Sequence, residues 1–68
     1  MSDLEKDFVF SLSMNPSAFE YYSSLDTKTQ GQINQYIQNA NDTNETKSRI
    51  LESINALNNN DTSFLFFL

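Results

Sequence analysis

The side chains of this sequence that could perform chemistry are carboxylates and phenols, because the chain has neither cysteine nor histidine. Those two residues supply most nucleophile–base pairs, and histidine is the commonest transition-metal ligand. There is also no glycine-rich phosphate loop and no His-Glu-x-x-His zinc motif. Catalysis needs titratable groups held within mutual reach in a concave site. We therefore predict that the protein is not an enzyme and uses no cofactor.

Two groups of carboxylates are candidates for binding a cation. Asp3, Glu5 and Asp7 lie near the N-terminus, where they also suit the positive end of a helix dipole. Asp42 and Glu45 could offer oxygen ligands to a hard cation, but a calcium loop needs more regularly spaced carboxylates and a glycine. A solvated helix start and a helix cap explain these two groups better, so we expect no metal site.

The aromatic residues Phe19, Tyr21, Tyr22 and Tyr36 could in principle stack on bases, as in RNA-binding domains. Tyr22 and Tyr36 fall at helical spacing with apolar residues, which favours packing in a core and leaves Tyr21 as the exposed exception. The charge also disfavours nucleic acid and anionic lipid, since four scattered Lys/Arg against nine Asp/Glu give a formal net charge of −5. We expect neither nucleic acid nor a membrane as a partner.

The most unusual feature is the segment 64–68, which reads Phe-Leu-Phe-Phe-Leu. Five consecutive apolar residues would be an aggregation hazard if they were extended in water. Three interpretations stay open: the segment covers a groove between helices, it docks on a second copy or a partner, or it is a recognition tag for a protease or a membrane surface. The first predicts that Phe64, Phe66 or Phe67, together with Leu68, is buried. The candidate interaction residues are Tyr21, Phe64, Phe66, Phe67 and Leu68.

A length of 68 residues allows one domain with a small core. Such a core typically supplies no more than about 3–5 kcal/mol, so natural miniproteins often add disulfides, a metal or a partner subunit. Without cysteine or histidine, self-association is the support that remains. The sequence shows no secretory signal and no apolar run near the roughly 20 residues that span a bilayer. We therefore expect a cytoplasmic protein.

Apolar residues recur at helical spacing in three interior segments, which predicts three helices that share one core. The sets are Ala18, Phe19, Tyr22 and Leu25; Ile33, Tyr36, Ile37 and Ala40; and Ile50, Leu51, Ile54 and Leu57. The residues that we expect to be buried are Ile33, Ile37, Ile50, Ile54 and Leu57.

The segment 8–14 is ambiguous. Alternate apolar residues fit a half-buried strand, whereas Leu4, Phe8 and Leu12 repeat at i, i+4, i+8 as on a helix. We favour the helix because an isolated strand needs a partner, and the only candidate is the short segment 63–68.

Signals for helix starts precede the interior segments. Asn15 offers a cap acceptor before Pro16 at the first helical position, and Asp26 can cap the next helix. The one glycine, Gly31, falls inside that helix, where it costs about 1 kcal/mol relative to alanine.

The last helix has two possible caps. Asp42 followed by Glu45 fits a capping box, while Thr43 is an equally suitable cap one residue later. Glu45 also precedes Arg49 by four residues, the favourable order for an ion pair on a helix.

Over about residues 7–57 the chain resembles the helical C-terminal segment of the YdeI/OmpD-associated (bacteriocin-protection) family. The resemblance is carried by Asn15-Pro16-x-Ala18-x-x-x-Tyr22-x-x-Leu25, by Tyr36-Ile37-x-x-Ala40 and by Glu45-Thr46 before Arg49. The chain is similar also to short uncharacterised proteins of low-GC Gram-positive bacteria. Family members are usually basic around the Glu-Thr pair, where this chain keeps only Lys47 and Arg49. The resemblance implies an all-helical architecture and no established enzymatic activity.

Together these observations predict an all-α fold, a small bundle of four short helices at about residues 4–13, 16–24, 27–40 and 44–58 with an apolar C-terminal tail. For function we expect a non-enzymatic protein-interaction module that binds a protein partner or self-associates. The alternative is a small peripheral membrane or stress-related peptide that uses its Phe-rich tail.

Overall fold

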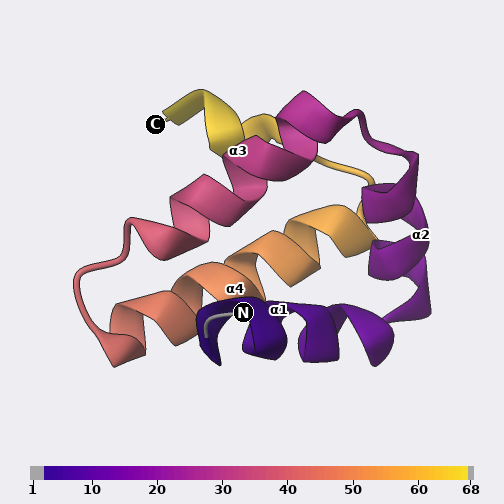
Figure 1. The fold of residues 1–68 in the computed structure, drawn as a ribbon. Coiled ribbons are helices and arrows are strands. Elements are labelled where there is room, and N and C mark those ends of the chain that lie inside the picture. The colour runs from indigo at the N-terminus through magenta and orange to yellow at the C-terminus, as the bar shows by residue number, and fades with distance from the viewer. Residues whose placement is uncertain (1–2, 68) are drawn as a thin grey trace.

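The computed structural model describes residues 3–67, and the side chains of residues 6–66, as four α-helices and a final 3-10 helix (Figure 1). The α-helices are α1 (Asp3–Ser13), α2 (Pro16–Ser24), α3 (Thr27–Gln38) and α4 (Thr43–Asn58), and the 3-10 helix is η1 (Ser63–Phe67). The described residues contain no strand, so the all-α prediction is confirmed. The helix bounds agree with the predicted ones to within two residues.

The helical interpretation of segment 8–14 is confirmed by burial as well as by backbone. Phe8 and Leu12 are only 2% and 3% exposed, because a spacing of four residues places them on the same face of α1. Val9, Phe10 and Met14 lie on the other sides of this segment and are exposed.

Helix α4 is the longest and packs against each of the other elements (Figure 1). In Figure 1, α1 lies beside α4 along the lower edge, α2 crosses the C-terminal end of α4, and α3 lies above it. The hydrophobic core forms where these helices meet. All five residues that were predicted to be buried belong to this core, namely Ile33, Ile37, Ile50, Ile54 and Leu57.

Three aromatic or aliphatic residues differ from their predicted positions. Leu51 and Phe19 belong to predicted apolar sets, yet they are 63% and 49% exposed. Each follows a buried residue directly, and a step of one residue turns the side chain about 100° around the helix axis. Tyr21, which was predicted to be exposed, is half-buried and packs against the core.

The helix caps follow the prediction at two starts and depart from it at one. Asp26 accepts a hydrogen bond from the backbone N–H of Thr29 at 3.0 Å. Hydrogen bonding by the Thr29 side chain and then by its backbone lowers the pKa of the Asp26 carboxyl. Asn15 occupies the N-cap position of α2, but its side chain makes no capping hydrogen bond, and its Nδ2 donates to the carbonyl of Ser11 at 2.7 Å. The prediction for Asn15 is wrong: its Oδ1, the atom that would accept at the cap, accepts from Nδ2 of Asn58 at 3.4 Å instead.

At the start of α4, Asp42 rather than Thr43 is the cap. Its Oδ1 accepts from the backbone N–H of Glu45 at 2.8 Å. The Glu45 side chain reaches back to the N–H of Asn41 at 3.0 Å, one residue before the partner that a regular capping box uses.

Helix α4 ends in a Schellman motif centred on Asn60, whose φ is 54°. The N–H of Asn60 donates to the carbonyl of Leu57 at 3.0 Å, and the N–H of Asp61 donates to that of Ala56 at 2.9 Å. The chain then turns back, and η1 packs against α3 and α4.

The outcome for the apolar tail is mixed. Phe64 is buried, 9% exposed, and its ring meets that of Tyr36 edge to face with centroids 5.7 Å apart. Phe66 is 83% exposed, so Phe64 and not Phe66 is the buried ring among the described residues of the tail. A 3-10 turn places successive residues about 120° apart, so Phe64 and Phe66 cannot face the core together. The side chain of Phe67 and the whole of Leu68 lie outside the described residues.

Candidate functional site

The predicted interaction residues whose side chains the structure describes, Tyr21, Phe64 and Phe66, do not form one surface. Tyr21 on α2 is half-buried beside the C-terminal end of α4, Phe64 is enclosed by α3 and α4, and Phe66 projects from η1. The predictions for Phe67 and Leu68 fall on side chains that are not described. Of the three described members, Phe66 is the residue that the structure leaves open to a partner.

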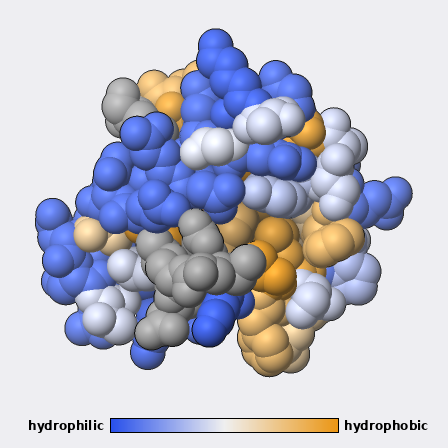
Figure 2. Space-filling model, viewed as in Figure 1, coloured by the Kyte–Doolittle hydropathy of each residue, from blue (hydrophilic) through white to orange (hydrophobic). Residues whose placement is uncertain are grey.

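A groove of about 300 Å³ between α1 and α4 brings together other apolar side chains. Phe10 from α1 and Leu51 from α4 form its walls and are 65% and 63% exposed, and Ile50 lies between them as part of the core. Figure 2 shows that the surface over α3 is largely hydrophilic, whereas apolar side chains gather below it, over α1. We call this hollow the α1–α4 groove.

Helix geometry explains which side chains line the α1–α4 groove. On α1, Asp7, Phe10 and Ser11 are three and four residues apart, so they share one face. On α4, Lys47 and Leu51 are likewise four residues apart. Each wall therefore combines one large apolar residue with one charged residue toward the start of its helix.

Exposed apolar side chains continue beyond the groove along α1. Met14 follows Phe10 by four residues and is 67% exposed. Phe19 at 49% exposure lines a neighbouring hollow with Ser13 and Pro16 at the junction of α1 and α2. Exposed apolar side chains thus extend from the groove to the junction of α1 and α2.

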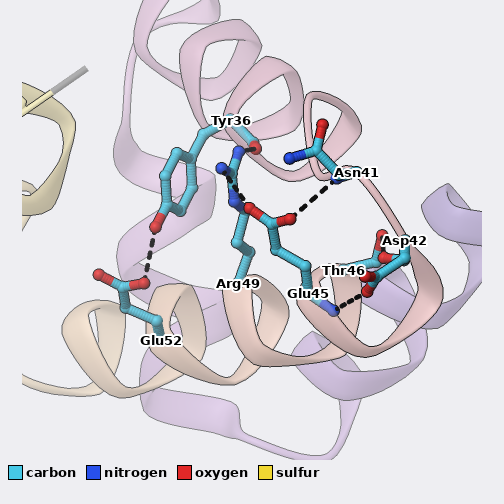
Figure 3. Close-up of polar contacts among 7 residues, drawn as sticks. All are labelled: Tyr36, Asn41, Asp42, Glu45, Thr46, Arg49 and Glu52. Atoms are coloured by element: carbon cyan, nitrogen blue, oxygen red, sulfur yellow. Dashed lines mark hydrogen bonds and ion pairs between the residues drawn. The ribbon is translucent and has the colours of Figure 1, made fainter.

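On the opposite side of α4, polar contacts tie this helix to α3 (Figure 3). The hydroxyl of Tyr36 donates to Oε2 of Glu52 at 2.6 Å, and Arg49 Nη1 donates to the Tyr36 carbonyl at 2.6 Å. The Arg49 guanidinium lies 4.6 Å from the centre of the Tyr36 ring. Its Nη2 lies 2.8 Å from Oε1 of Glu45, which confirms the predicted ion pair.

This group of contacts is suited to holding two helices together. The pKa of the Tyr36 phenol is raised because its proton is bonded to the Glu52 carboxylate and because partial burial disfavours the phenolate. A phenol with a raised pKa stays protonated at neutral pH and is a poor nucleophile. Arg49 has its guanidinium engaged by a carboxylate, a carbonyl and a ring at once.

Within the described part of the chain, no three or more His, Cys, Asp or Glu side chains are grouped so that they could hold a metal ion. Asp42 and Glu45 act as helix cap and ion-pair partner instead. No helix among residues 3–67 combines the length and the hydrophobicity that crossing a membrane requires.

Comparisons with protein-family models, with curated proteins and with solved structures found no match. The resemblance to the YdeI/OmpD-associated family therefore stays a prediction.

Sequence reasoning missed Phe10 and Leu51 as surface residues. A signal for Phe10 was present, because a helix that buries Phe8 and Leu12 necessarily turns Phe10 away from them. No comparable signal separated Leu51 from its neighbour Ile50, since both fit the apolar spacing of α4.

Proposed function

We propose that the protein is a non-enzymatic protein-interaction module whose binding surface is the α1–α4 groove. One observation carries the proposal: Phe10 and Leu51 face the same groove and each leaves more than 60% of its surface exposed. Large apolar side chains that lie together within a polar surround are typical of sites that bind other proteins. An exposed phenylalanine can serve as the buried anchor of an interface once a partner covers it.

The sequence supports the other parts of this proposal. Absence of cysteine and histidine favours a binding role over catalysis, and a net charge of −5 disfavours nucleic acid as the partner. We place the protein in the cytoplasm on the sequence grounds given above, and in a bacterium on the resemblance to bacterial families.

Photocrosslinking tests whether the groove meets a protein. A benzoylphenylalanine incorporated at Leu51 should give an adduct of discrete mass when the cells that make the protein are irradiated. The same probe at Lys28, which is exposed on α3 and lies outside the groove, is the matched control and should give none. Adding Phe10→Ser to the Leu51 probe should abolish the adduct. An absence of adducts at Leu51, or equal adducts at both positions, would contradict the proposal.

A second candidate function, insertion of the tail into lipid, is favoured by the 83% exposure of Phe66. On this alternative the wild-type chain should co-sediment with liposomes, and Phe66→Ser should leave it in the supernatant. The interaction-module proposal expects both chains in the supernatant, because anionic lipid repels an acidic chain. The assay should compare vesicles of phosphatidylcholine alone with vesicles that also contain phosphatidylserine. This comparison separates insertion of the Phe66 ring from the effect of lipid charge.

A further inference from the structure

We infer that the occupant of the α1–α4 groove is a second copy of this chain, related to the first by a two-fold axis that runs along the groove. The inference rests on the proposed function and deepens it by naming the partner.

The charges on the rim of the groove are complementary to those on the same rim of a second copy. Asp7 lies on the α1 wall and Lys47 on the α4 wall. Neither side chain has an ion-pair or hydrogen-bond partner among the residues that the structure describes. In a two-fold interface the same patch serves both copies, so a contact of one residue with another occurs twice. A patch with one acid and one base on different walls can therefore form two ion pairs. In each of them, Asp7 of one copy pairs with Lys47 of the other.

The course of the two helices makes this pairing geometrically consistent. α1 and α4 lie side by side and run in the same general direction (Figure 1). A two-fold axis along the groove exchanges the two walls and places α1 of each copy over α4 of the other. The same rotation brings Phe10 of one copy against Leu51 of the other, three or four residues beyond the charged pair.

Charge is also compatible with self-association at this face. The whole chain carries −5, so two copies repel each other across most orientations. The groove is lined by one acidic and one basic residue, which gives it no net charge. Two copies can therefore meet here without opposing like charges. A basic protein partner would be better matched by a rim of carboxylates alone.

The area required sets the expected strength of the dimer. A standard interface covers about 800 Å² on each partner, and the whole chain exposes 4582 Å². The groove must therefore be joined by neighbouring surface, which Met14 continues along α1. We expect a weak and reversible dimer, whose interface is no larger than this standard size.

Sedimentation equilibrium with charge-exchanged variants tests the inference. For the wild-type chain, the mass should rise from 7.8 kDa toward twice that value as the concentration increases. Asp7→Lys and Lys47→Asp should each raise the dimer Kd by about tenfold or more, because each places like charges across both contacts. An equimolar mixture of these two variants should recover dimers, because each variant then faces the opposite charge at both positions.

Matched controls separate this effect from net charge and from folding. Lys28→Asp and Glu20→Lys make the same charge changes at exposed sites outside the groove and should leave the dimer Kd unchanged. Circular dichroism of all variants should match that of the wild-type chain, since each substituted side chain is exposed.

Two results would overturn the inference. A wild-type chain that stays at 7.8 kDa over the whole concentration range has no second copy in the groove. A dimer that is indifferent to both charge reversals, or a variant mixture no better than its components, places the interface elsewhere. If the Leu51 probe still crosslinks to a different protein, the interaction-module proposal stands while this inference fails; if that probe gives no adduct, the proposal itself fails.

Discussion

The hydroxyl oxygen of Tyr36 on α3 lies 2.6 Å from Oε2 of Glu52 on α4. The same tyrosine offers its carbonyl and its ring face to Arg49, one helical turn before Glu52. On its inner side the ring meets Phe64, which η1 brings back over the helix pair. Tyr36 therefore joins α3, α4 and η1, and its protonation is coupled to the stability of the fold.

The first prediction concerns alkaline pH. Because the pKa of Tyr36 is raised, the folded state holds this proton more tightly than the unfolded chain does. The resulting stabilisation is fully present below the unfolded pKa of about 10 and is lost as the pH rises through the higher folded pKa. In urea melts between about pH 7 and 11.5, Tyr36→Phe should lose less stability above pH 10 than the wild-type chain.

At pH 7 the same substitution should cost about 0.5 kcal/mol, the low end for a hydrogen bond, because the contact is exposed to water. Tyr21→Phe is the control, since the hydroxyl of Tyr21 makes no hydrogen bond within the described residues. Identical alkaline profiles for Tyr36→Phe and the wild-type chain would show that the Glu52 contact is absent in solution.

The second prediction is that Gly31→Ala stabilises the protein. Gly31 lies inside α3 with ordinary helical backbone, and an added Cβ would meet no atom within 4 Å. Alanine removes the entropic cost of glycine in a helix, so we expect a gain of about 0.5–1 kcal/mol and a rise in Tm of roughly 2–8 °C. Gln32→Ala in the same turn is the control and should change Tm by much less. A lower Tm for Gly31→Ala would mean that α3 does not continue through this position.

The third prediction compares two leucines of α4. Leu57 is completely buried, so Leu57→Ala should cost about 2–5 kcal/mol, which is comparable to the whole stability expected of a domain this small. Leu51→Ala removes the same atoms from an exposed site and should stay within about 0.5 kcal/mol. Thermal melts should be recorded at low protein concentration, where self-association does not contribute. Equal losses for the two variants would contradict the orientation of α4.

The fourth prediction concerns the apolar tail. Phe64→Ala should destabilise the fold by about 3 kcal/mol, because it removes a buried ring together with its contact to Tyr36. Phe66→Ala, two residues later, should change the stability by no more than about 0.5 kcal/mol. Urea titrations of the two variants provide the comparison. The tail has no structural role if both variants unfold at the wild-type midpoint.

Local rules were sufficient to predict the helices and much of the core. Asp26 and Asp42 cap their helices because a carboxylate before an apolar periodic segment can reach an N–H three residues on, whatever surrounds it. Ile33 and Ile37 are buried because their spacing places them on one face, and that face is the most apolar side of α3. Such features depend on contacts between residues that are close in sequence.

The candidate site depended on how the helices dock. Ile50 and Leu51 are adjacent and both apolar, and the amphipathic pattern of α4 is wide enough to include either one. Ile50 is buried and Leu51 is exposed because α1 lies where it covers the first and only borders the second. Asn15 also depends on docking, because its Oδ1 accepts from Nδ2 of Asn58, which is 43 residues away in sequence.

The tail was decided in the same way. Composition alone predicted that residues 64–68 must be shielded from water, but it did not determine which phenylalanine ring would be buried. The left-handed turn at Asn60 directs η1 over α3 and α4, and only the side of η1 that carries Phe64 meets Tyr36. Apolar spacing in the sequence thus determined which segments form helices and bury a face. Which of two neighbouring apolar side chains became core and which became surface was set by the docking of segments distant in sequence, because burial requires a partner on the other side.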